Sequence, residues 1–150
     1  MGQKYIVFDR DGTLIDLIPY ISNLKDVKIK SDAVESLIKL RDAGYKFGII
    51  TNQSAIARGL ATESQVNEIN KLIADEFMKQ NVHFDFIYYC PHHPEANCLC
   101  RKPKTELLDR AIDEFNIELK FSFMIGDQLS DVEFGKNAGL NAILLSDANI

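Results

Sequence analysis

The chain has 150 residues, of which 46% are hydrophobic and 26% charged, and its formal net charge is -5. This length suits one domain with its own core, so we expect a single domain over residues 1–150. The ordinary composition excludes a disordered or fibrous chain, and the scattered basic residues exclude a protein held on nucleic acid by phosphate contacts.

No apolar run approaches the roughly 20 residues that a membrane-spanning helix needs. The apolar stretch from Tyr5 to Phe8 is too short for a signal peptide. We therefore expect a cytoplasmic protein with no membrane partner. We also expect a monomer, because no exposed apolar stripe is evident in the sequence.

In chain order, short apolar runs alternate with amphipathic stretches, which is typical of repeated βα units and a parallel sheet. The runs that predict five strands are residues 5–8, 46–50, 86–89, 122–125 and 142–145. The stretches that predict helices run from Ser31 to Gly44, from Thr62 to Phe77, from Leu107 to Phe115 and from Ser130 to the residue before Gly139. The sequence therefore predicts an α/β domain.

Three of these helices have recognisable start signals. Ser31 is expected to be an N-cap. Thr62 has a glutamine three residues later, and Ser130 has a glutamate at the same spacing, so both pairs predict capping boxes. Gly44 and Gly139 are expected at helix ends, since glycine readily adopts the left-handed backbone conformation found there.

Polar side chains follow each of the first four predicted strands. They are Asp9 and Asp11, Thr51 and Asn52, the segment from Cys90 to Lys102, and Asp127. In open parallel sheets, ligands bind at the carboxyl ends of the strands. All the candidate chemistry is therefore expected along one edge of the sheet.

The segment after the first strand places two carboxylates two residues apart, Asp9 and Asp11, followed by Gly12. These acids would repel a phosphate dianion unless a hard cation such as Mg²⁺ lay between them. Asp9 is then expected to attack phosphorus, while Asp11 protonates the leaving alkoxide and later activates water. The alternative is that both acids merely cap a turn.

Further candidate groups follow the later strands. Thr51, Asn52 and Gln53 offer donors for phosphate oxygens, although a loop with an N-cap is an alternative. Lys102 is expected to neutralise the transferring phosphoryl group, unless it lies in a solvated surface turn. Asp127 is the expected Mg²⁺ ligand. The neighbouring Asp131 either supports that site or stabilises the start of a helix.

All three cysteines of the chain lie within residues 90–100. With one histidine they form the pattern C-x-H-x5-C-x-C, which suits a structural tetrahedral Zn²⁺. The expected ligands are Cys90, His92, Cys98 and Cys100. His93 is an alternative to His92, and three incidental free thiols are the alternative to a metal site. A bound ion would stiffen the loop so that Arg101 and Lys102 point into the site.

These four polar segments, in this order, resemble the four motifs of the haloacid dehalogenase-like hydrolase superfamily, from Val7 to about Leu145. The resemblance implies a Rossmann-like, three-layer α/β/α fold without a large cap domain. It also implies an aspartyl-phosphate intermediate, and Mg²⁺ bound by the carboxylates of Asp9 and Asp127 and the main-chain carbonyl of Asp11. The pattern of the superfamily favours His92 over His93.

The zinc loop resembles that of two groups in the superfamily, the D-glycero-D-manno-heptose 1,7-bisphosphate phosphatases and the histidinol-phosphate phosphatases. Residues 51–63, TNQSAIARGLATE, are more similar to the heptose bisphosphate phosphatases. This chain departs from their pattern at Ala55 and Gln128, and its C-terminus is shorter than that of many of them. The resemblance implies removal of the 7-phosphate during nucleotide-activated heptose biosynthesis. Arg58 and Arg101 are expected near a second phosphate, with surface exposure as the alternative.

Other functions remain open from the sequence. The same chemistry on histidinol phosphate or another small phosphate ester is the first alternative. A phosphotransferase or mutase with the same intermediate is a second. A zinc-stabilised binding module without catalysis is an alternative of a different class.

Overall fold

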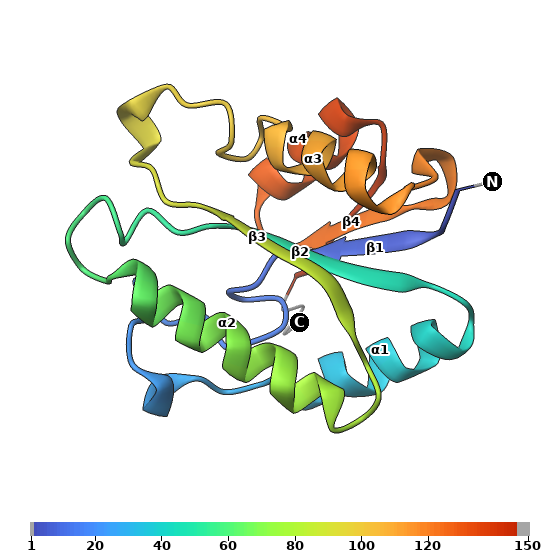
Figure 1. The fold of residues 1–150 in the computed structure, drawn as a ribbon, viewed down its shortest axis with the longest axis horizontal. Helices are drawn as coiled ribbons and strands as arrows, with labels where there is room; N and C mark the ends of the chain where they lie inside the picture. The colour runs from blue at the N-terminus through green and yellow to red at the C-terminus, as the bar shows by residue number, and fades with distance from the viewer. Residues whose placement is uncertain (1, 147–150) are drawn as a thin grey trace.

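A computed structural model of the protein describes residues 2–146 and contains one five-stranded parallel sheet with helices on both faces (Figure 1). The strands are β1 (Tyr5–Phe8), β2 (Lys46–Asn52), β3 (Phe84–Cys90), β4 (Phe123–Gly126) and β5 (Asn141–Leu144). The helices are α1 (Ser31–Asp42), α2 (Glu63–Met78), α3 (Glu106–Phe115) and α4 (Leu129–Ala138). The strand order β3-β2-β1-β4-β5 places the first strand in the centre. The predicted α/β/α class is confirmed.

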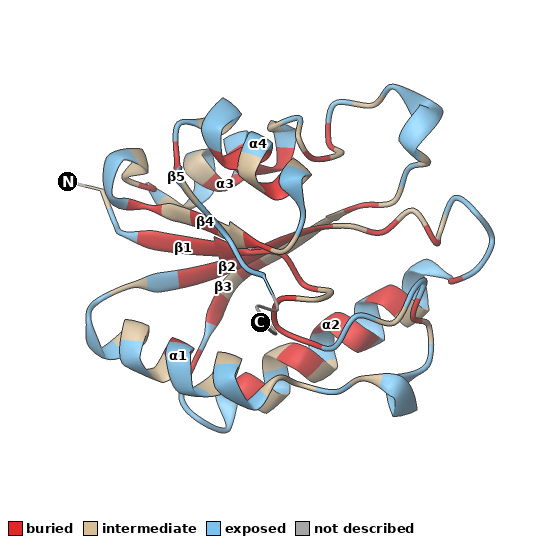
Figure 2. Ribbon diagram, turned by 180° about the vertical axis from the view of Figure 1, so that it is seen from behind, coloured by how far each residue is buried: buried red, intermediate tan, exposed pale blue. Residues whose placement is uncertain are grey.

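Alternate side chains of the strands enter two separate hydrophobic clusters, one on each face of the sheet. Tyr5 and Val7 of β1 pack with buried residues of α3 and α4. Ile6 and Phe8 pack on the other face with buried residues of α1 and α2. Figure 2 shows β1 to β4 largely buried, whereas the edge strand β5 and the outer sides of the helices are largely exposed. The continuous apolar run of β1 is thus explained by burial on both faces.

The predicted strand boundaries were wrong at two functionally relevant ends. β2 continues through Thr51 and Asn52, and β3 includes Cys90, because the parallel ladder pairs Thr51 with Tyr89 and Asn52 with Cys90. A search for apolar runs stops at the first polar residue, whereas backbone pairing does not depend on side-chain polarity. The polar residues of β2 are therefore held by the sheet itself.

The predicted capping residues of two helices were also wrong. Lys30 is the N-cap of α1 and makes no side-chain capping bond, so Ser31 is already helical. The capping box of α4 is formed by Gln128 and Asp131, whose carboxylate accepts a hydrogen bond from the main-chain N–H of Gln128 at 3.1 Å. The predicted capping box of Thr62 in α2 is confirmed, as is the helix end before Gly139, which has φ 83°.

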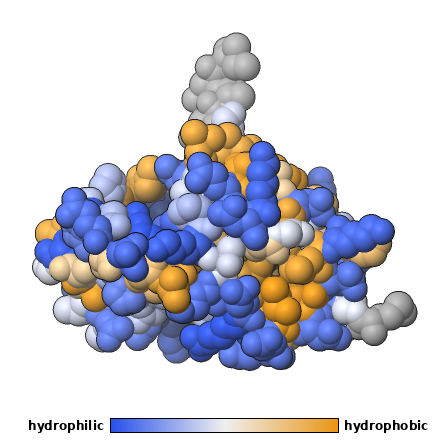
Figure 3. Space-filling view, turned by 90° about the horizontal axis from the view of Figure 1, so that it is seen from above, coloured by the Kyte–Doolittle hydropathy of each residue, from blue (hydrophilic) through white to orange (hydrophobic). Residues whose placement is uncertain are grey.

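On the face seen in Figure 3, hydrophilic residues cover most of the surface and hydrophobic residues lie in separate patches. The exposed large hydrophobic residues of the described chain are scattered along the sequence; examples are Leu17, Tyr20, Leu60 and Leu99 in loops, Phe121 in a short 3₁₀ helix and Leu129 at the start of α4. Within residues 2–146, no helix is long and apolar enough to cross a bilayer. The expected monomer stays a prediction.

Candidate active site

The ammonium group of Lys102 lies at the carboxyl ends of the central strands and bridges two of the predicted acidic segments. Its Nζ donates to Asp9 Oδ1 at 2.9 Å, to Asp131 Oδ1 at 2.7 Å and to the main-chain carbonyl of Ile50 at 2.7 Å. Burial alone would lower the pKa of Lys102, but the charges of Asp9 and Asp131 outweigh it and raise the pKa. Lys102 is therefore a buried cation, and the alternative of a solvated surface turn is excluded.

The two carboxylates that bind this cation form a cluster with a third, that of Asp127. Oxygen atoms of Asp9, Asp127 and Asp131 lie within 4.8 Å of one another. Gly12 has φ 81°, and a Cβ there would collide with the Asp127 carboxylate, so the glycine permits the close approach of the two loops. The predicted proximity of the segments after β1 and β4 is observed.

The side chain of Asp127 is in an environment that a cation would stabilise. Its Oδ1 is buried and has no hydrogen-bond partner within the described chain. Burial, followed by the negative charge of Asp9, raises the pKa of Asp127 to about 6. A hard cation with oxygen ligands would satisfy both features. The residues thus fit the predicted Mg²⁺, with Asp9 and Asp127 able to offer carboxylates and Asp11 a carbonyl.

The carboxylate of Asp11 is held by two side chains that sequence reasoning did not connect with it. Arg10 donates from Nε to Oδ2 and from Nη2 to Oδ1, both at 3.1 Å. Gln53 Nε2 donates to Asp11 Oδ2 at 2.7 Å and to Thr51 Oγ1 at 2.9 Å. Gln53 therefore links Asp11 to the end of β2, a contact that its predicted role in substrate binding did not include.

Asn52 contacts the backbone of Lys102, two residues after the last cysteine of the loop. Its Oδ1 accepts from the main-chain N–H of Lys102 at 3.0 Å, and its Nδ2 donates to the Lys102 carbonyl at 3.3 Å. The side-chain amide thereby pairs with the backbone of Lys102 much as a neighbouring strand would. Both the Oδ1 and the Nδ2 of Asn52 therefore have partners in the protein, and its predicted contact with phosphate stays a prediction.

The two predicted arginines differ in their surroundings. Arg101 is half-buried, and its Nη1 is buried without a hydrogen-bond partner among the described residues. Arg58 is exposed; its Nε donates to Ser54 Oγ at 3.1 Å, and its guanidinium lies 5.3 Å from the ring centroid of Tyr20. Arg101 thus has a free donor that an anion would satisfy.

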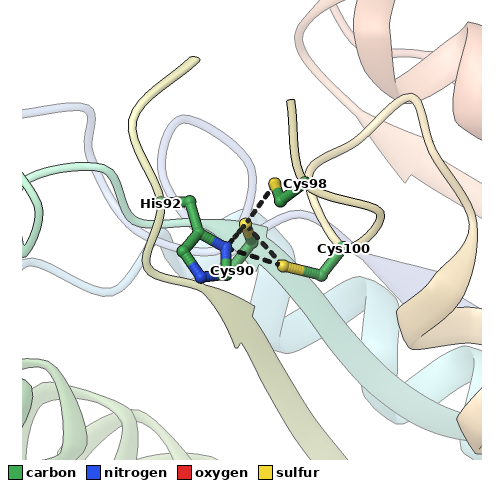
Figure 4. A group of neighbouring side chains, drawn as sticks. All are labelled: Cys90, His92, Cys98 and Cys100. Atoms are coloured by element: carbon green, nitrogen blue, oxygen red, sulfur yellow. Dashed lines mark hydrogen bonds between the residues drawn. The ribbon is translucent and has the colours of Figure 1, made fainter. Parts of the chain in front are cut away.

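The predicted zinc ligands come together at the end of β3, whose last residue is Cys90, and in the loop that follows it (Figure 4). They are Cys90, His92, Cys98 and Cys100. Their ligand atoms lie within 4.8 Å of one another, and His92 Nδ1 is 3.1 Å from Cys100 Sγ. Sulfur ligands around a tetrahedral Zn²⁺ would lie about 3.8 Å apart, given Zn–S bonds of about 2.3 Å. The sulfurs of Cys90 and Cys98 lie 3.6 Å apart, close to this value, whereas those of Cys90 and Cys100 lie 2.8 Å apart and would have to separate around the ion. The donor set and its convergence therefore fit Zn²⁺.

The alternative ligand His93 has another role. Its Nδ1 accepts a hydrogen bond from the main-chain N–H of Glu95 at 3.1 Å and caps the short 3₁₀ helix Pro94–Ala96. Close to the cluster, the carbonyl of Cys90 accepts from the main-chain N–H of Gln53 at 2.8 Å. The cysteine cluster is thus joined directly to the residues that hold Asp11.

The sequence model of the haloacid dehalogenase-like hydrolases matches residues 17–145. The chain belongs to this family. Three other comparisons agree with that membership and with the predicted enzyme class, a phosphatase of the haloacid dehalogenase-like hydrolases.

A Thermoplasma volcanium protein named probable D-glycero-D-manno-heptose-1,7-bisphosphate 7-phosphatase is 38% identical over 95% of this chain and 98% of its own length. The histidine biosynthesis bifunctional protein HisB of Legionella pneumophila is 37% identical over 96% of this chain, which spans 42% of that longer protein. The crystal structure of D,D-heptose 1,7-bisphosphate phosphatase from B. bronchiseptica, complexed with magnesium and phosphate, has a TM-score of 0.86 and 26% identity. That similarity covers 94% of this chain and 79% of the other.

Proposed function

We propose that the protein is a Mg²⁺-dependent phosphomonoester hydrolase that removes the 7-phosphate of D-glycero-D-manno-heptose 1,7-bisphosphate. The observation that carries the chemistry is the buried Lys102 ammonium between Asp9 and Asp131, in the same cluster as Asp127, whose Oδ1 has no hydrogen-bond partner among residues 2–146. A buried cation next to a nucleophilic carboxylate suits a reaction in which negative charge moves on phosphoryl oxygens.

The reaction would proceed in two displacements at phosphorus. A carboxylate oxygen of Asp9 forms a bond to phosphorus while the bond from phosphorus to the sugar oxygen breaks, and the Asp11 carboxyl gives its proton to that oxygen. Water then attacks phosphorus and gives a proton to Asp11, and the Asp9–phosphorus bond breaks. Lys102 neutralises the carboxylate and the phosphoryl group throughout. Mg²⁺ held by Asp9, Asp127 and the Asp11 carbonyl would offset the repulsion between the dianion and the acids.

The heptose substrate is supported by the names of the similar proteins and by the free donor of Arg101. A substrate with two phosphates needs a second cationic contact outside the reacting centre, and Arg101 and the exposed Arg58 are the candidates. Ala55, one departure from the heptose-enzyme pattern, is buried and packs with Ala61 and Val66. It therefore gives little reason to expect a different substrate.

Histidinol phosphate is the second candidate substrate, because the HisB protein matches this chain almost as closely. Phosphate release should be measured with both compounds in the presence of Mg²⁺. We expect kcat/KM to be higher for the heptose bisphosphate. A higher kcat/KM for histidinol phosphate would overturn the assignment of heptose bisphosphate as the substrate. If folded, metal-loaded protein released phosphate from neither compound, the result would favour a binding module without catalysis.

We further propose that residues 90–100 hold a structural Zn²⁺ within a single domain of residues 1–150. The three cysteines form no disulfide within the described residues, and metal-ligating cysteines suit a cytoplasmic location, where disulfides are rare. A short loop cannot form a hydrophobic core of its own, so a zinc ion would stabilise it instead. The ion would also fix the position of the next residues in the chain, Arg101 and Lys102.

Cys98→Ser is expected to abolish zinc binding, because it removes one of four ligands that the site needs for tetrahedral coordination. Metal analysis of purified protein should show close to one zinc per chain in the wild type and little in the variant, together with a lower Tm. His93→Gln is the matched control, since His93 caps a turn beside the cluster. An unchanged zinc content in Cys98→Ser would contradict the ligand assignment.

A further inference from the structure

Arg10 is completely buried, which is unusual for a charged side chain. Two of its nitrogens bind both oxygens of Asp11, and the third, Nη1, donates to Asn70 Oδ1 at 2.9 Å. Asn70 lies on α2, is 7% exposed, and faces the sheet rather than solvent. A continuous polar connection therefore runs from the middle of α2 to the carboxylate of Asp11.

The geometry of this connection restricts the orientation of Asp11. A guanidinium group is planar, so fixing three of its nitrogens fixes the plane in which both oxygens of a paired carboxylate must lie. Asn70 binds the end of the Arg10 guanidinium that does not contact Asp11. Without this acceptor, one buried N–H would lack a partner, and Arg10 would gain freedom to turn away.

We propose that Arg10 and Asn70 are positioning residues that orient Asp11 for proton transfer to the leaving oxygen, an inference that rests on the proposed function. Neither side chain needs to touch the substrate. Arg10 acts on Asp11 directly, and Asn70 acts through Arg10. Gln53 holds the same carboxylate from the β2 side by donating to Oδ2, so Asp11 is fixed from two elements of the fold. Within the described chain, Oδ2 thus accepts two hydrogen bonds and Oδ1 only one, which leaves Oδ1 the lone pair that would carry the transferred proton.

Proton transfer by Asp11 matters more for some leaving groups than for others. A sugar alkoxide is strongly basic and leaves readily only when protonated, whereas p-nitrophenolate leaves without a proton. The value of kcat/KM includes the steps up to formation of the Asp9 phosphoryl bond, during which the leaving group departs. Misplacement of Asp11 should therefore lower kcat/KM for a sugar phosphate far more than for p-nitrophenyl phosphate.

The experiment compares Asn70→Leu with Asn70→Asp, which keeps an oxygen acceptor for Arg10. Asn67→Leu is the matched control, because it makes the same change at an exposed position of α2. In Asn70→Leu, the ratio of kcat/KM for heptose bisphosphate to that for p-nitrophenyl phosphate should fall by about tenfold, part of the 10² to 10⁴ that a general acid contributes. Asn70→Asp should retain most of the wild-type ratio.

Arg10→Met provides a second test and should lower the ratio further if the variant folds, as circular dichroism can establish. An equal loss on both substrates in Asn70→Leu, or no loss, would overturn the positioning role. Failure of the wild type to hydrolyse either substrate would instead refute the proposed function. The two failures are therefore distinguishable in one set of assays.

Discussion

Asp9→Asn is expected to lower kcat for phosphate release by roughly 10⁴-fold or more, because an amide oxygen is a poor nucleophile and forms no stable phosphoryl bond. The substitution keeps the size of the side chain and an oxygen acceptor for Lys102, so the fold should survive. Steady-state assays with the heptose bisphosphate would measure the loss. Trapping of labelled phosphate on the wild type, and none on the variant, would identify the covalent step.

Asp16→Asn is the matched control for this experiment. The Asp16 side chain is 52% exposed and lies 3.8 Å from Lys30, so the same chemical change there should leave kcat nearly unaltered. Turnover of Asp9→Asn within tenfold of the wild type would exclude Asp9 as the nucleophile.

Lys102→Met should both inactivate the enzyme and destabilise it by about 3–5 kcal/mol, the usual effect of removing one partner from a buried ion pair. Met fills a similar volume but leaves Asp9 and Asp131 facing each other without the cation. Urea unfolding of the metal-free protein would measure the free energy of unfolding. The control is Lys136→Met, the same change at an exposed lysine of α4. A decrease of less than about 1 kcal/mol in the free energy of unfolding of Lys102→Met would contradict a buried ion pair.

The destabilisation should also depend on pH. Burial already raises the pKa of Asp131, and Lys102 acts to lower it, so removal of Lys102 raises that pKa further. A carboxyl group with a folded-state pKa above its unfolded value favours folding more as the pH falls. The difference in unfolding free energy between variant and wild type should therefore be larger at pH 7 than at about pH 5.

The sheet was largely predictable from the sequence because strands buried on both faces, such as β1, leave continuous apolar runs. The segments carrying Asp9, Lys102 and Asp127 were also predictable as neighbours, since parallel strands end at one edge. The polar ends of β2 and β3 were missed because backbone pairing continues past the last apolar side chain. The capping box of α4 was missed for a related reason: it is formed by Gln128 and Asp131, whereas capping boxes usually begin with Ser or Thr.

The connections around Asp11 were not predictable from local patterns. Arg10 and Asn70 are separated by 60 positions in the chain, and each is ordinary in its own segment. Burial of Asn70 gave a weak signal, because it lies four residues after Val66 and one after Ile69 on the apolar side of α2. Arg10 and Asn70 come into contact only because α2 packs against the sheet.

The central position of β1 has a consequence for biosynthesis. β1 pairs with β2 on one side, but its other neighbour, β4, begins more than 110 residues later, at Phe123. A nascent chain that ends before β4 would therefore leave one edge of this apolar strand unpaired, and such edges recruit other chains. We expect ribosome-bound fragments ending before β4 to bind chaperones, and release of the chain to follow when β4 and β5 emerge and β4 pairs with the open edge of β1.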